Sequence, residues 1–207
     1  MNNIHFIASE RQYVRPLGTA LFFGSEGKTL AQWLRVYEAT TVKVAAELMP
    51  EGEFSKFNDT QLSQRLADSL AVEPLKLYIA RAGRGLSQVN VAGRDGAELP
   101  LRRSRLGVRA VVEIPFSGFE ELWYLLPSRH STAYPHGRLV GQNLEIGVET
   151  IETRANEVAA FLDKQIRSVS EFLEEQATDI AAFNARLLER VGPLIGRRRQ
   201  KLSAVSI

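Results

Sequence analysis

The chain has 207 residues, of which 44% are hydrophobic and 24% charged, and its formal net charge at pH 7 is +2. This composition indicates a folded protein, because it supplies enough apolar surface to offset the entropy lost on folding. So small a net charge excludes a global polycation, and nucleic-acid binding would need a local basic patch. The chain has no cysteine, which excludes disulfides, thiolate nucleophiles and sulfur-based zinc sites.

The N-terminal segment MNNIHFIASERQYVRP lacks a long apolar core behind a basic start, so no signal peptide is predicted. No apolar stretch approaches the roughly 20 residues that a membrane helix needs. The absence of cysteine fits a reducing compartment. We therefore expect a cytoplasmic protein without a membrane partner.

Two helices are predicted in the first third of the chain, after a short strand or two within 1–28. Thr29 and Gln32 have the spacing of a capping box, and apolar residues follow at helical spacing up to Pro50. The β-branched run TTVKV at 40–44 is less favourable for the second half of this helix. Asn58 or Asp59 is suited to cap a second helix, whose apolar face is formed by Leu62, Leu66 and Leu70.

Strands are predicted after Pro74. The segment 75–80 has apolar residues on both faces and is predicted as a strand. The segment 82–96 is rich in Gly, Asn and Asp, which favours a turn or hairpin with a short strand at 89–91. The clearest strand is 106–116, where alternate residues form a purely apolar face. Further along, 119–126 fits a strand or a helix, 127–137 a loop, and 139–148 another strand.

From residue 152 the apolar period changes to steps of three and four, and no Gly or Pro occurs before Gly192 and Pro193. An unbroken helix over 152–191 would span about 60 Å. Such a helix either breaks near Asn184 and folds back or pairs with another chain, as in a coiled coil. The residues of this stripe are the predicted interface: Val158, Leu162, Ile166, Val169, Leu173, Ile180, Phe183 and Leu187.

These elements predict an α+β fold. A mostly antiparallel sheet with N-terminal helices forms a domain over 1–150, and a long helical segment or helical hairpin with a basic C-terminus follows over 151–207.

Three segments in the second half of the chain carry a family resemblance. They are VEIPFSGFEELWYLLPS (112–128), DIAAFNARL (179–187) and RRRQKL (197–202). In this order, residues 106–202 resemble the N-terminal regions of uncharacterised bacterial multidomain proteins that precede an effector-type domain, such as a nuclease or a TIR domain. The resemblance implies a recognition or regulatory part of a bacterial defence system and no catalytic residues.

The segment GSEGKT at 24–29 has the setting of a phosphate-binding loop, because an apolar run precedes it and a helix follows. A P-loop requires a glycine five positions before its second glycine, and that position is Phe22 here. Glu26 and Lys28 also match the end of a restriction-type nuclease site, but the preceding segment 19–23 supplies no second carboxylate for Mg²⁺. A tight turn that leads into a capped helix is the favoured interpretation.

The three histidines do not form a recognisable catalytic or metal site. His130 and His136 share one loop with Ser128, while His5 lies far away in the sequence. A serine nucleophile would need an orienting acid and a GxSxG-type turn, and no such turn is present. Glu120 and Glu121 are adjacent and would not converge as an acid and base pair. No catalytic residue, metal ligand or cofactor is predicted.

Two basic clusters provide the remaining binding hypothesis. One lies at the C-terminus, and the other comprises the candidate nucleic-acid ligands Arg81, Arg84, Arg102, Arg103, Arg105 and Arg109. Phosphate contacts by such side chains give an affinity that falls steeply with salt. The segment 152–180 is acidic, so helix pairing or partner contact fits the charges as well.

The sequence thus favours a non-enzymatic recognition or assembly module of a bacterial cytosolic system, acting as a homo-oligomer or with a separate effector protein. Two alternatives remain open. One is a nucleic-acid-binding protein that uses the 81–109 region, and the other is a nucleotide- or metal-dependent enzyme, a nuclease or NTPase, at Gly24–Thr29.

Overall fold

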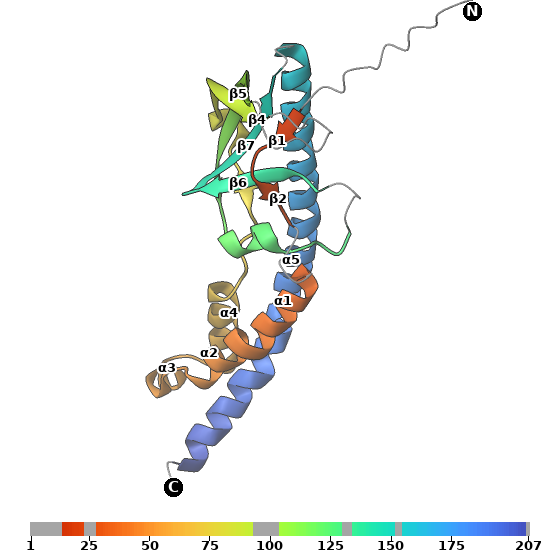
Figure 1. Ribbon diagram of the computed structural model, residues 1–207. Helices are drawn as coiled ribbons and strands as arrows, with labels where there is room; N and C mark the ends of the chain where they lie inside the picture. Colours follow the sequence, from red (N-terminus) through yellow and green to blue (C-terminus); the bar gives the residue numbers. More distant parts are fainter. Residues whose placement is uncertain (1–13, 23–27, 93–103, 130–133, 152–154, 206–207) are drawn as a thin grey trace, which may run out of the picture. The chain divides into compact units, whose positions relative to one another are not determined.

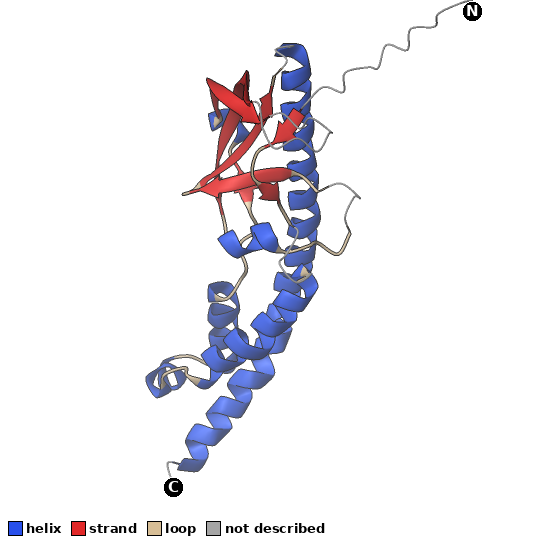
Figure 2. Cartoon of the chain, viewed as in Figure 1, coloured by secondary structure: helices blue, strands red, loops and turns tan. Residues whose placement is uncertain are grey.

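The computed structural model describes residues 14–22, 28–92, 104–129, 134–151 and 155–205 (Figures 1 and 2). As predicted, the fold is α+β, with an antiparallel sheet, N-terminal helices and a long C-terminal helix. The chain divides into two compact units. Unit 1 comprises Met1–Ala20, Tyr78–Phe116 and Pro135–Arg167, and unit 2 comprises Leu21–Leu77, Ser117–Tyr134 and Ser168–Ile207.

Unit 1 is built on an antiparallel sheet. Its strands are β1 (Val14–Pro16), β2 (Thr19–Ala20), β4 (Gly83–Ala92), β5 (Ser104–Ser117), β6 (His136–Val140) and β7 (Asn143–Thr150). Strand β7 pairs with β5 along one edge and with β6 and β1 along the other. Strand β4 pairs with the second edge of β5, and β2 pairs with β6.

The two faces of this sheet differ in chemistry. Ala110, Val112 and Ile114 of β5 lie beside Val148, Ile146 and Leu144 of β7 and form a buried apolar face. The first turns of helix α5 (Ala155–Val205) supply Leu162, which is buried in the same unit. The backbone N–H of His136 donates to Oε1 of Gln165 at 2.9 Å, which ties β6 to α5.

Unit 2 consists mainly of helices. They are α1 (Leu30–Tyr37), the π-helical turn η1 (Glu38–Val42), α2 (Lys43–Glu47), α3 (Glu51–Lys56), α4 (Asp59–Ser69), the 3-10 turn η3 (Glu120–Tyr124) and α5 from Ser168 onward. Its core contains fully buried Phe22, whose ring lies 4.8 Å from that of Phe172 and 5.5 Å from that of Trp123. The remaining elements are strand β3 (Lys76–Leu77) of unit 2 and the 3-10 turn η2 (Ile79–Arg81) of unit 1.

Both predicted helix starts are confirmed. The Thr29 side chain accepts a hydrogen bond from the N–H of Gln32, and the Gln32 side chain accepts one from the N–H of Thr29. Asn58 and Gln61 form the same reciprocal arrangement at α4. Each capping box satisfies N–H groups that a helix start otherwise leaves without partners.

The β-branched run TTVKV does not end the first helix. It is accommodated by the π-helical turn η1, so that α1, η1 and α2 follow one another without a gap. Such a turn inserts one residue into the helical ladder and shifts the face that later residues present. Val42, at its end, is fully buried.

Three strand predictions need correction. In 75–80 only Lys76–Leu77 is a strand, since 79–81 forms a 3-10 turn. The segment predicted as a turn or hairpin contains the ten-residue strand β4, because pairing with β5 outweighs the low strand propensity of its glycines. The single strand predicted over 139–148 is the hairpin of β6 and β7, which turns at Gly141 with a φ of 57°.

The long helix also departs from the prediction. Helix α5 passes through Asn184, Gly192 and Pro193 without a break and continues to Val205, so the predicted alternative of a helical hairpin is wrong. Proline removes one hydrogen bond from a helix interior. Val191 and Ile195 are fully buried on either side of Pro193, and their burial favours continuation of the helix.

Candidate functional site

The apolar stripe of α5, predicted as an interface, is largely used within its own chain. Six of its eight residues are buried, with exposed fractions of 8% or less: Leu162, Val169, Leu173, Ile180, Phe183 and Leu187. Val158 and Ile166 are half-buried. A second chain would therefore meet little of this stripe, and contact through it stays a prediction.

Polar side chains fix the second part of α5 within unit 2. Gln176 is buried, and its Nε2 donates to the carbonyl oxygens of Leu122 and Leu125 at 2.8 and 2.7 Å. This amide therefore holds the 3-10 turn η3 against the helix. Its own Oε1 atom has no hydrogen-bond partner.

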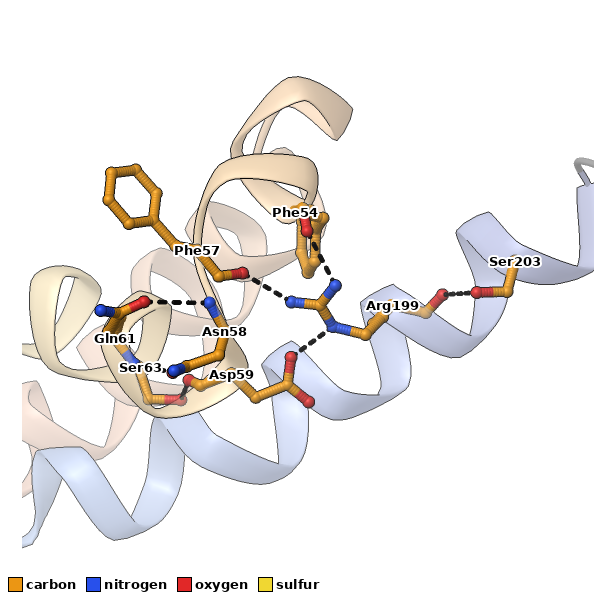
Figure 3. A network of polar contacts seen from close by, with 8 residues as sticks. All are labelled: Phe54, Phe57, Asn58, Asp59, Gln61, Ser63, Arg199 and Ser203. Carbon is orange, nitrogen blue, oxygen red and sulfur yellow. Dashed lines mark hydrogen bonds and ion pairs between the residues drawn. The ribbon is translucent and has the colours of Figure 1, made fainter.

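Arg199 plays the same role near the end of α5 (Figure 3). Its guanidinium donates to Oδ1 of Asp59, to the carbonyl oxygen of Phe54 at 2.8 Å and to that of Phe57 at 2.9 Å. The guanidinium also lies 5.1 Å from the centre of the Phe54 ring. Three acceptors at the α3–α4 junction thus occupy one of the cations in the predicted C-terminal basic cluster.

The predicted arginine cluster of the 81–109 region is divided by the sheet. Arg84 and Arg109 lie on opposite faces, because Arg109 pairs with Ser87 and side chains alternate along β4. Arg109 is bonded to Oε1 of Glu149 at 2.6 Å, and Arg81 lies 5.2 Å from the ring centre of Tyr78. Arg102 and Arg103 lie outside the described residues, as does the side chain of Arg105. The structure therefore does not bring the described members together on one face.

The sheet face that carries Arg109 is an ionic surface. Besides the Arg109–Glu149 pair, Arg138 bonds to Oε2 of buried Glu145 at 2.8 Å. The hydrogen bond that Arg138 donates to Glu145, reinforced by the charges of Glu145 and Glu113, raises the pKa of Arg138. Arg138 of β6 lies opposite Glu145 of β7, and Arg109 of β5 lies opposite Glu149 of β7, so each cation pairs with a carboxylate on the neighbouring strand.

Most of the predicted phosphate-binding turn lies outside the described residues, as do His5 and His130. Of the turn, the structure describes Lys28 and Thr29, and the Thr29 side chain caps α1. Within the described ranges, no group of three or more His, Asp or Glu side chains is placed to hold a metal ion.

An apolar groove lies beside β4 in unit 1. Its volume is about 320 Å³, and it runs between β4, β5 and the first turns of α5. Its walls come from Leu86, Val108, Ala110, Val158, Ala159 and Leu162. Leu86 is 77% exposed, and Leu106 on the same face is 66% exposed. Exposed leucines beside an apolar groove are typical of a binding surface.

Strand β4 pairs with β5 along one edge and has a second, outer edge. None of the described strands pairs with this edge, and residues 83–88 and Asn90 are exposed. The strand has ten residues, of which Arg84 is the one charge, and it contains no proline or lysine. Natural edge strands are usually protected by such residues or kept short.

The hydrogen bonds of β5 show which β4 residues face outward. The carbonyl of Pro115 accepts from Tyr78, which precedes β4, while the N–H of Phe116 donates to Gln142 on the β7 side. Because bonding directions alternate along an antiparallel strand, odd-numbered residues of β5 bond to β4. Their β4 partners have odd numbers too, and the groups that point outward belong to Arg84, Leu86, Gln88 and Asn90.

These four residues also present their side chains to the α5 side of the sheet, since Arg84, Leu86 and Gln88 lie opposite Val112, Ala110 and Val108. Main-chain donors and acceptors therefore lie directly beside the apolar groove. We call this combination the β4 edge site. It consists of the outward backbone groups of 84–90 and the groove along Leu86 and α5.

Sequence reasoning missed this site, because it did not recognise 83–88 as a strand. The usable signal was the position of the segment, which precedes the clear strand 106–116 and is separated from it by the turn-forming GRDG at 93–96.

Comparisons of the chain with protein-family models, with curated proteins and with solved structures find no match. Within the part of the chain that the structure describes, no helix combines the length and apolar character needed to span a membrane.

Proposed function

We propose that this chain is a protein-binding module that adds an extended polypeptide strand to the outer edge of β4. The observation that carries the proposal is the open ten-residue edge beside an apolar groove. In strand addition, main-chain hydrogen bonds supply affinity and pockets for alternate side chains supply specificity. The β4 edge site offers both on one side of one strand.

The proposal includes the biological setting in which this binding takes place. The resemblance of residues 106–202 favours a recognition or assembly module of a bacterial cytosolic system, where binding regulates an effector-type domain or protein. The ionic pairing of Arg109 and the separation of Arg84 from it support protein binding over nucleic-acid binding, because a phosphate backbone is bound by cations that share a face.

A displayed library of random linear peptides tests this proposal. The protein is immobilised sparsely, so that copies on the surface do not meet. We expect enrichment of peptides in which every second residue is apolar, because alternate side chains of an added strand face the groove.

Two exposed leucines provide a matched pair of variants. Leu86 at the edge site and Leu48 in unit 2 are 77% and 74% exposed. Leu86→Asp should reduce peptide binding at least tenfold, whereas Leu48→Asp should leave it unchanged. The proposal fails if no peptide is enriched, or if both variants bind the selected peptides as the wild type does.

A further inference from the structure

We infer that the strand that occupies the β4 edge is β4 of a second copy of this chain, paired antiparallel about a two-fold axis at Ser87. The inference rests on the proposed function and names the partner for the same site. A two-fold contact of one strand with itself is necessarily antiparallel, and both copies present the same surface. The two sheets then join into one continuous sheet.

The register follows from the outward backbone groups. In an antiparallel ladder, outward-facing residues of one strand bond to outward-facing residues of the other. An axis at Ser87 places Leu86 opposite Gln88 of the copy and Arg84 opposite Asn90 of the copy, so all four outward residues are used. An axis at Leu86 or at Gln88 would leave one of the four without an outward-facing partner among them.

The charges of β4 suit this pairing. Arg84 is the single charged residue of the strand, so a pairing of two β4 strands that placed Arg84 beside Arg84 of the copy would bring two like charges together. The antiparallel register places the two Arg84 residues six positions apart, which is about 20 Å. At that distance, physiological salt largely screens their repulsion. Each arginine instead faces the neutral Asn90.

The exposed apolar surface is covered by the same contact. Because side chains keep their face across a joined sheet, Leu86 of both copies lies on the α5 side, at diagonal positions. Each leucine, 77% exposed in one chain, then packs near its copy and beside both grooves. On the opposite face, Gly83, Gly85 and Ser87 are small, and a Cβ on either glycine meets nothing within 4 Å. Val89 is the larger side chain on that face, and in this register it lies opposite Gly85 of the copy, so it meets no second side chain there.

The absence of cysteine from the chain permits a direct test of the register. In this pairing Ser87 lies opposite its own copy at a non-hydrogen-bonded position, where the Cα atoms are about 4.5 Å apart. That spacing lies within the range of disulfides, roughly 4.4 to 6.8 Å. Under mild oxidation with copper-phenanthroline, Ser87→Cys should form a disulfide-linked dimer. Asn90→Cys is the control in the same strand, since each Asn90 lies about 20 Å from its copy.

A second variant removes the contact without disturbing the fold. The N–H of Gln88 points outward and makes no bond to β5, so Gln88→Pro deletes one intermolecular donor on each copy. Native mass spectrometry should show a dimer for the wild type and a monomer for Gln88→Pro at the same concentration. The circular dichroism spectrum should be unchanged, which separates loss of pairing from loss of folding.

Three results would overturn the inference. They are a wild-type monomer at every concentration, a dimer that survives Gln88→Pro, and a dimer that cross-links equally at Ser87→Cys and Asn90→Cys or at neither. A wild-type monomer that still binds library peptides in a manner sensitive to Leu86→Asp overturns the self-pairing and leaves the proposed function standing. A monomer that binds no peptide overturns both.

Discussion

The side-chain amide of Asn184 forms a reciprocal pair of hydrogen bonds with the backbone of Val72. The N–H of Val72 donates to Oδ1 at 3.0 Å, and Nδ2 donates to the carbonyl oxygen of Val72 at 2.9 Å. One amide thus completes the hydrogen bonding of a residue that is 1% exposed and belongs to no helix or strand. An asparagine that suggests a helix break in the sequence instead attaches the segment after α4 to α5.

Asn184→Ala should lower the free energy of unfolding by about 2 to 3 kcal/mol, because both polar backbone groups of Val72 lose their partner in a buried setting. Urea denaturation measures the change. Asn156→Ala is the control, since Asn156 is exposed in the same helix and should change stability by no more than about 0.5 kcal/mol. Equal effects of the two variants would contradict a specific role for Asn184.

Two substitutions of Gln176 should destabilise the protein to different extents. Gln176→Met keeps the side-chain shape and loses the hydrogen bonds to the carbonyl oxygens of Leu122 and Leu125. Because it also removes the unpartnered Oε1, we expect the free energy of unfolding to fall by only about 1 to 2 kcal/mol. Gln176→Glu should cost more at neutral pH, because a buried carboxylate would face two carbonyl oxygens. Exposed Gln200→Met is the control. The reverse order of the two Gln176 variants would show that this amide is not a donor.

Arg199→Lys tests the contact at the α3–α4 junction. A lysine ammonium cannot reproduce the planar fork that reaches Asp59, Phe54 and Phe57, so the variant should lose about 1 to 2 kcal/mol, a modest value because the site is partly exposed. The neighbouring Arg197→Lys should be nearly neutral, since its guanidinium contacts a carbonyl of its own helix. Thermal unfolding of both variants decides the point, and a neutral Arg199→Lys would rule out the junction contact.

Tyr37 should make the stability of the folded state depend on pH. Burial raises the pKa of its hydroxyl above the ordinary value of 10.0, and the hydroxyl donates to the carbonyl oxygen of Leu70 at 3.2 Å. A raised pKa means that the folded state favours the neutral form, so this stabilisation is complete below pH 10 and is lost as the pH rises through the folded-state value.

Tyr37→Phe should therefore cost about 1 kcal/mol at pH 8, and its difference from the wild type should shrink above pH 10. Denaturant titrations at several pH values measure this difference. Tyr124→Phe, at an exposed position, should leave stability unchanged at pH 8. A Tyr37→Phe deficit that grows with rising pH would contradict the sign of the pKa shift.

The features that the sequence predicted well are local. The capping boxes at Thr29 and Asn58 depend on contacts between residues three apart. The strand 106–116 is recognisable because every second residue is apolar. The long helix was also predicted by its period. Its continuation past Pro193 was not, because the burial of Val191 and Ile195 is a tertiary effect that local rules for proline do not include.

The β4 edge site could not be predicted because it depends on distant pairings. The glycines of β4 indicate a turn when they are considered alone, and β5 makes them part of a strand. Whether a strand lies at the edge of a sheet depends on the order of all strands, which in turn places Leu86 beside α5. The predicted interface residues of α5 show a related limit. An apolar stripe can be recognised in the sequence, but the sequence does not show whether the same chain or a partner covers it.

The alternation of side chains along β4 limits how many residues of a bound strand this edge can select. Backbone groups of Arg84, Leu86, Gln88 and Asn90 offer the same bonds to any extended chain, whereas side-chain selection falls on the α5 side alone. Every second residue of a bound strand is therefore free to vary at little energetic cost. In a second copy of β4, Leu86 is the one apolar residue among the four that face the α5 side, so partners of this surface share constraints at alternate positions and no continuous motif.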